Sequence, residues 1–238
     1  MSGRHAPPAA LLSLPVRNRL AELILEAFEH AEPRATLLAV ARVAAVPTAT
    51  VDAADRGRLL ALEWFETAGD GVRLRGALRA QGPALAERAG RAARAVGAWA
   101  DPAGDELVRL LSRAAALADA GLFFEAHELL EPAWFQAVPP VRTALQGLIQ
   151  VAVAFHHLSQ DNRAGALALL AEGRARLETA PDALPLALLH WLGELARVQA
   201  TIARGEAPEA VPAWPRPAAP AAASAEDGDR GEGRWRCS

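Results

Sequence analysis

The chain has 238 residues, of which 52% are hydrophobic, so it is long enough to bury a sizeable core. Its 25 basic residues are all arginine and are balanced by 28 acidic residues, which argues against the basic excess that nucleic-acid backbones attract. The one cysteine, Cys237, excludes an internal disulfide framework and favours a cytoplasmic location, while the longest uncharged run, residues 143–160, has too many polar side chains for a membrane span.

Residues 15–78 are predicted to form a small unit of helices followed by a hairpin. Asn18 is the expected cap of the first helix, and Thr48 or Thr50 the expected cap of the third. Asp70-Gly71, between two short extended segments, is typical of a hairpin turn. The spacing of apolar residues predicts the three helices at 18–30, 35–45 and about 48–65.

This order of elements resembles a winged helix-turn-helix over residues 40–76, and the resemblance implies DNA binding. The predicted third helix carries Arg56 and Arg58. It also carries Asp52 and Asp55, whose carboxylates would repel DNA phosphates. Two interpretations therefore stay open: a DNA-binding unit, and a small module for protein binding or domain packing. Weak or no binding to DNA is expected.

A helical bundle is expected at 105–205, after a connector at 79–104 that holds a short helix at 87–100. Residues 210–238 are dominated by Pro, Ala, Gly and Ser, and they are predicted to be a disordered tail. The fold class is therefore mainly α, with a winged-helix-like unit and its hairpin in front of the bundle. Turn-forming residues predict the bundle helices at 105–120, 122–136, 141–159, 163–178 and 183–204.

Two sequence blocks in the bundle carry a family resemblance. The first is GLFFEAHELLEPAW at 121–134, and the second is LQGLIQ at 145–150, followed by His156 and Asn162. In order and spacing, both resemble the bacterial domain-of-unknown-function 309 family over residues about 105–205. The resemblance implies a small helical bundle, and it brings no established activity.

The first block predicts a helix that is apolar on two sides. Phe124 and Phe135 lie nearly opposite the main apolar stripe, so His127 and Glu131 fall between two apolar strips and are expected to be buried. Glu125 is expected to face water. Ala126, Leu129, Leu130 and Ala133 form the main stripe.

A buried carboxylate at Glu131 would need partners. His127, one helical turn away, and Arg142, across the Pro139-Pro140 turn, are the expected ones. Pro132 removes a backbone hydrogen bond, so the helix is expected to kink or end there.

The next helix has a polar stripe formed by Gln146, Gln150 and His157. These side chains either face water or face His127 and Glu131 across the helix pair. His156 lies on the apolar side, where it is either a core residue or a ligand. The candidate polar site accordingly comprises His127, Glu128, Glu131, Gln146, Gln150 and His156, supported by Trp134 and Arg142.

The HELLE segment at 127–131 is similar to the HExxH helix of zinc proteases, but Glu131 replaces the second histidine. A protease is therefore not expected. A divalent metal remains a hypothesis, with His127, Glu131 and His156 as candidate ligands beside Glu128, because imidazole and carboxylate groups suit several transition metals.

Three functions stay open from the sequence. The first choice is a non-enzymatic binding or scaffolding module with an unknown small-molecule or protein partner. The second is a metal-dependent or acid–base enzyme that uses the HELLE motif. The third is a transcriptional regulator, in which the winged-helix-like unit binds DNA; DNA is the least expected partner, and no membrane partner is expected.

Overall fold

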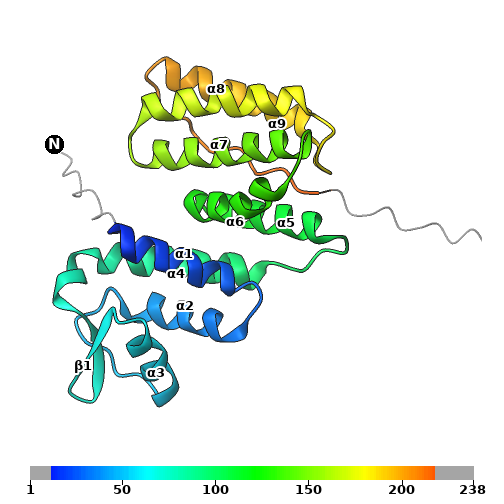
Figure 1. The fold of residues 1–238 in the computed structure, drawn as a ribbon. Helices are drawn as coiled ribbons and strands as arrows, with labels where there is room; N and C mark the ends of the chain where they lie inside the picture. Colours follow the sequence, from blue (N-terminus) through cyan, green and yellow to red (C-terminus); the bar gives the residue numbers. More distant parts are fainter. Residues whose placement is uncertain (1–11, 218–238) are drawn as a thin grey trace, which may run out of the picture.

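The computed structural model describes residues 12–217 and is mainly α-helical, as predicted (Figure 1). Within that range, no helix is both long enough and apolar enough to cross a membrane. The N-terminal unit consists of α1 (Leu14–Glu26), α2 (Ala31–Val43), α3 (Ala53–Ala61), β1 (Phe65–Ala68), β2 (Gly71–Leu74), the 3-10 helix η1 (Gly76–Gln81) and α4 (Gly82–Ala98). The bundle consists of α5 (Glu106–Asp119), α6 (Phe123–Gln136), α7 (Val141–Ser159), α8 (Arg163–Thr179) and α9 (Leu188–Ala203).

Two predicted helix caps in the N-terminal unit are wrong. Asn18 lies inside α1, because the helix begins earlier, with Pro15 in its first turn. Proline is tolerated there because a backbone N–H in the first turn has no partner within the helix. Asp52 caps α3 in place of either threonine, since its carboxylate accepts a hydrogen bond of 2.8 Å from the backbone N–H of Asp55.

The predicted hairpin is present. Strands β1 and β2 are antiparallel, with Phe65 opposite Leu74, and Gly69 supplies the positive φ of the turn. Ala49 adds a single bridge to β2 at Val72. However, residues 44–52 separate α2 from α3, whereas a helix-turn-helix has a turn of about 3–4 residues. This spacing departs from the DNA-binding motif, and the winged-helix resemblance stays unconfirmed.

The segment expected to be a connector is part of the N-terminal unit. Its helix α4 begins at Gly82, earlier than predicted, and buries Leu85, Ala89 and Val96 against α1 and α2. α5 and α6 lie between this unit and the layer of α7, α8 and α9 (Figure 1). The two parts therefore share one continuous hydrophobic core.

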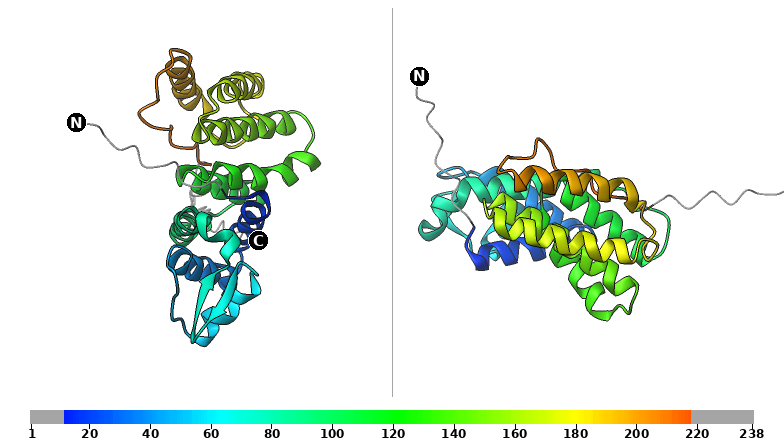
Figure 2. Two further views of the ribbon diagram at one scale, coloured as in Figure 1. Left: turned by 90° about the vertical axis from the view of Figure 1, so that its left-hand side faces the viewer. Right: turned by 90° about the horizontal axis from the view of Figure 1, so that it is seen from above.

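Inside the bundle, α7 and α8 approach each other at two glycines. A side chain at Gly147 would come within 2.9 Å of the backbone oxygen of Gly173, so only glycine fits this crossing. Pro132 does not end α6, which continues to Gln136. The end of α6 and the start of α7 then project beyond the rest of the molecule (Figure 2).

Residues 210–217, which were expected to belong to the disordered tail, lie against the bundle. Trp214 is 3% exposed and packs edge-on against Trp191, with ring centroids 5.0 Å apart. Asp119 accepts hydrogen bonds of 2.7 Å from the Trp214 backbone and from the Arg216 guanidinium. The predicted boundary at residue 210 is therefore wrong, and the rest of the predicted tail, 218–238, lies outside the described residues.

Candidate functional site

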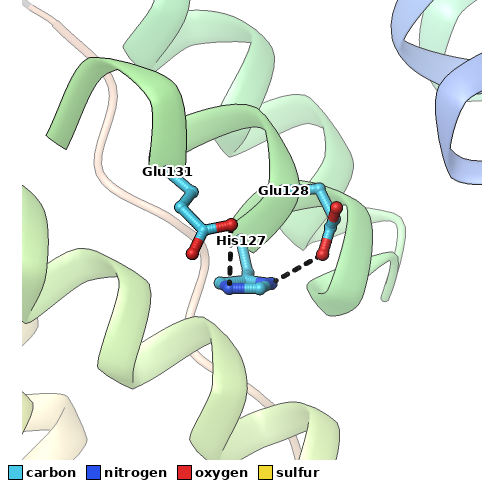
Figure 3. A group of neighbouring side chains, drawn as sticks. All are labelled: His127, Glu128 and Glu131. Carbon is cyan, nitrogen blue, oxygen red and sulfur yellow. Dashed lines mark ion pairs between the residues drawn. The ribbon is translucent and has the colours of Figure 1, made fainter. Parts of the chain in front are cut away.

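The HELLE motif places three ligand-type side chains on one exposed part of α6 (Figure 3). His127 and Glu131 are one helical turn apart, and Glu128 follows His127 directly. The helix starts here because Gly121, with a φ of +70°, ends the preceding turn, and Leu122 and Phe123 are buried at the first turn of α6. The site is thus positioned by a rigid helix.

The imidazole of His127 lies between the two carboxylates. Its Nδ1 is 3.4 Å from Glu128 Oε1, and its Nε2 is 4.0 Å from Glu131 Oε2 (Figure 3). One ligand atom from each residue lies within 4.8 Å of the others. The predicted pairing of His127 with Glu131 is therefore seen as a close approach, although 4.0 Å is too long for a hydrogen bond.

The predicted burial of Glu131 is wrong. Its side chain is 54% exposed, while that of His127 is 20% exposed. The reason is that the second apolar strip is not covered along its whole length: Phe124 is buried, but Phe135 is 73% exposed on the projecting end of α6 (Figure 2). Glu131 therefore faces solvent.

Two of these residues, His127 and Glu131, could hold a divalent metal ion, with Glu128 behind the histidine. Two ligand atoms bound to one tetrahedral ion at about 2.1 Å each lie about 3.4 Å apart, so the 4.0 Å gap between His127 Nε2 and Glu131 would have to close slightly, which a rotation of the exposed Glu131 side chain allows. His127 Nδ1 is shielded from solvent and has no hydrogen-bond partner in the described residues. Glu128 is near enough to accept its N–H after a small rotation, as a carboxylate does behind many metal-binding histidines.

His156, the third metal candidate from the sequence, lies elsewhere. Its ring centroid is 5.7 Å from that of Phe124, and it is not part of the group formed by His127 and the two glutamates. Burial is the largest cause that lowers the pKa of His156 to about 4, and the positive charges of Arg88 and Arg17 act in the same direction. The imidazole is therefore neutral at pH 7.

The expectation that Glu125 faces water is wrong. It is fully buried, and Arg88 of α4 donates two hydrogen bonds of 2.7 Å to its two carboxylate oxygens. The outward face of α6 at this position is covered by the N-terminal unit, which a helical wheel of α6 alone does not include. Arg17 of α1 completes the contact, with its guanidinium carbon 4.0 Å from the centre of the Phe124 ring.

Two residues of the polar stripe of α7, Gln150 and His157, have partners at α8 and not at His127. Gln150 donates a hydrogen bond of 2.7 Å to Glu172 of α8, and His157 lies 2.9 Å from the side chain of Asn162 in the loop before α8. Gln146 is half-buried. Gln150 and His157 therefore belong to the contact between α7 and α8.

The two supporting residues form a pair of their own. The guanidinium of Arg142 lies 5.0 Å from the Trp134 ring centre, a cation–π contact at the start of α7. The expected ion pair between Arg142 and Glu131 is not formed. In the part of the chain that the structure describes, the carboxylate of Glu131 has only His127 as an ionic neighbour.

Two arginines at α3, Arg58 and Arg42, are paired with acidic side chains, whereas Arg56 donates a hydrogen bond of 2.9 Å to the backbone oxygen of Asp70. Arg58 donates to Asp55 at 2.8 Å and to Glu32 at 2.9 Å, and Arg42 also pairs with Asp55. In the hairpin, Arg73 pairs with Glu66 at 2.8 Å. Cations that already have carboxylate partners offer little to DNA phosphates, so these contacts argue against a DNA-binding surface.

Residues 111–169 match the family model described as Domain of unknown function (DUF309). No curated protein and no solved structure matches the chain. The match covers α6, α7 and the HELLE motif, and the N-terminal unit lies outside it. The resemblance to the DUF309 family is therefore confirmed for residues 111–169.

Proposed function

We propose that this protein is a metal-binding module that holds a divalent transition-metal ion at His127, Glu128 and Glu131. The observation that carries the proposal is the convergence of one imidazole and two carboxylates within 4.8 Å on an accessible helix face. A nitrogen ligand beside carboxylate oxygens suits ions such as Zn²⁺ and Mn²⁺.

The roles of the three side chains follow from their positions. His127 Nε2 and Glu131 face the same gap, so they would be the direct ligands. Glu128 approaches the other ring nitrogen, where it would accept the Nδ1–H and keep the Nε2 lone pair directed at the ion. An ion held by so few protein ligands keeps open positions, which a bound metal uses to polarise or hold a further ligand.

A second histidine–glutamate pair in the chain shows why spacing alone is not enough. His190 Nε2 and Glu194 on α9 are also one turn apart, at 3.6 Å, but the His190 side chain is 82% exposed and, in the described residues, no second carboxylate lies close to the pair. His190 is therefore a matched control for His127: a helical histidine that faces a glutamate without forming a site.

The test is a direct titration of the chelator-treated full chain with Zn²⁺ and Mn²⁺, read by calorimetry, with elemental analysis of the purified protein alongside. Wild type and His190→Ala should bind one ion per chain at the α6 site, whereas His127→Ala should lose most of that binding. Equal binding by all three proteins, or none by the wild type, would reject the proposal.

A further inference from the structure

The hairpin formed by α6 and α7 exposes two large apolar side chains at its end. Phe135 in the last turn of α6 and Val138 in the loop that follows are each 73% exposed, and this end of the hairpin projects beyond the rest of the molecule (Figure 2). Other large exposed apolar residues of the described chain, such as Leu38 and Leu189, lie singly on separate helices. Single exposed apolar residues are ordinary, whereas grouped ones mark a surface that another molecule covers.

This end of the hairpin, residues 134–142, is held in one shape and is called the hairpin tip below. The backbone N–H of Arg142 donates a hydrogen bond of 3.0 Å to the carbonyl oxygen of Val138, which ties the loop to the first turn of α7. The guanidinium of Arg142 lies 5.0 Å from the Trp134 ring centre, so the same side chain also joins α7 to α6. A surface that is already ordered loses little conformational entropy when it binds.

Opposite charges lie on the two sides of the tip. Glu131 is one helical turn before Phe135 on α6, and Arg142 is one turn after Val138 at the start of α7. In the described residues Arg142 makes its contact with a tryptophan ring and has no carboxylate partner. Glu131 has only the His127 nitrogen at 4.0 Å, which is too far for a hydrogen bond.

Such an arrangement is complementary to itself. A two-fold contact between identical chains needs one patch in which residue i meets residue j of the other copy and residue j meets residue i. When two tips pack side by side about a two-fold axis, α6 of each copy lies along α7 of the other. Glu131 of each copy then faces Arg142 of the other copy, with the exposed apolar side chains between the two ion pairs.

We propose that the hairpin tip is the contact surface of a two-fold dimer of this chain. A partner with charge of one sign would satisfy only one side of the tip, and the carboxylates of Glu128 and Glu131 disfavour an anionic membrane surface. The tip is a small part of the molecule, so the dimer is weak and depends on protein concentration. The inference goes beyond the proposed metal site and does not rest on it.

The experiment is analytical ultracentrifugation of the full chain at pH 7, from low to high micromolar protein, with chelator and a reducing agent present. The wild type should show a monomer–dimer equilibrium. Phe135→Glu should raise the dimer dissociation constant at least about 10-fold, because it places a carboxylate in the apolar centre of the contact. Leu189→Glu changes an apolar residue that is 89% exposed on α9, and it should leave the dissociation constant unchanged.

An exchange of charges tests the two-fold pairing itself. Arg142→Glu and Glu131→Arg each place like charges opposite one another in both ion pairs, so each variant alone should dimerise at least about 10-fold more weakly than the wild type. An equal mixture of the two variants restores opposite charges across the axis and should dimerise nearly as well as the wild type. The same recovery is expected when one chain carries both changes.

A wild type that stays monomeric at high micromolar concentration would reject the dimer and leave a different protein as the occupant of the tip. Equal effects of Phe135→Glu and Leu189→Glu would also overturn the inference, because the dimer would then use another surface. A mixture of Arg142→Glu and Glu131→Arg that dimerises no better than either variant alone would contradict the two-fold pairing. Thermal melts of the variants confirm that each is folded before it is compared.

Discussion

Glu125 and Glu131 lie on the same helix, α6, but their surroundings differ. Glu125 is fully buried, and Arg88 meets both of its oxygens at 2.7 Å. Glu131 is 54% exposed, and its nearest ionic neighbour is a histidine nitrogen at 4.0 Å. A carboxylate with all its partners inside the protein has nothing to offer a ligand, whereas one that is exposed beside an imidazole does.

The difference has a structural origin. The first turns of α6 lie against α1 and contact α4 through the Arg88–Glu125 pair, while its last turns extend beyond them (Figures 1 and 2). One helix therefore serves two purposes: its beginning joins the N-terminal unit to the bundle, and its middle presents the HELLE motif. Removing the carboxylate of Glu125 should therefore lower the stability of the fold, whereas removing that of Glu131 should affect metal binding and leave the stability of the metal-free protein nearly unchanged.

The largest effect is expected for Glu125→Ala. It would leave the Arg88 guanidinium buried without a counter-charge, and breaking a buried ion pair from one side typically costs about 3–5 kcal/mol of unfolding free energy. Urea unfolding measures the loss. Glu131→Ala, on the exposed part of the same helix, should cost under about 0.5 kcal/mol in metal-free protein. Equal losses for the two variants would remove the distinction between the two parts of α6.

The segment after α9 provides the next test. Trp214→Ala would remove a buried ring that contacts Trp191, and truncation of a buried tryptophan typically costs about 3 kcal/mol or more. Val211→Ala, 38% exposed in the same segment, should cost under about 0.5 kcal/mol. A thermal melt of Trp214→Ala that coincides with that of the wild type would show that this segment does not dock in solution.

A smaller effect is expected from pH. The pKa of His156 is about 4 in the folded protein, compared with the ordinary 6.5. As the pH falls, the imidazole is therefore protonated in the unfolded chain before it is protonated in the folded protein. Acidification from pH 6.5 towards pH 4 should therefore destabilise the wild type through this group, by about 1–2 kcal/mol after allowance for screening, because the ring is only half-buried.

The measurement is the urea midpoint at pH 7 and at pH 5 for the wild type and for His156→Phe. The variant should lose less stability on acidification than the wild type does, since the carboxylates that also titrate in this range are common to both proteins. The charged neighbours of the ring, Arg88, Arg17, Glu125 and His157, are unchanged in the comparison. Identical pH dependences would show that His156 titrates normally.

The smallest effect is expected for DNA. Arg58, Arg42 and Arg73 have carboxylate partners, as Arg88 has, so these cations belong to the structure and not to a binding surface. Random duplex DNA at physiological salt should bind with no measurable change in fluorescence anisotropy up to high micromolar protein. Tight binding that weakens steeply with added salt would contradict this interpretation.

Local signals in the sequence predict much of the fold. The bounds of α7, Val141–Ser159, agree with the prediction because Pro139-Pro140 and Asp161-Asn162 mark both ends. The hairpin follows from Asp70-Gly71 in the same way. The start of α9 was predicted too early, because residues before Leu188 are held in turns that include a bridge from Leu186 to Pro217.

In the candidate site, features that depend on one helix could be predicted from the sequence, and features that depend on distant segments could not. The approach of His127 to Glu131 could be predicted, because both lie on one helix and one turn apart. The burial of Glu125 could not, because its partner Arg88 lies 37 residues earlier in a segment that reads as a connector. The exposure of Glu131 likewise depends on how far α6 projects, which no pattern within the helix specifies.

The most direct test of the α6 site is the thermal stability of chelator-treated protein with and without Zn²⁺. At a free metal concentration of about 100 times Kd, a bound ion should stabilise the folded state by about 2.7 kcal/mol. The melting temperature of the wild type and of His190→Ala should therefore rise with Zn²⁺ and fall back when chelator is added, while that of His127→Ala should not respond. A Zn²⁺ response of equal size in all three proteins, or no response in the wild type, would contradict a metal site at His127, Glu128 and Glu131.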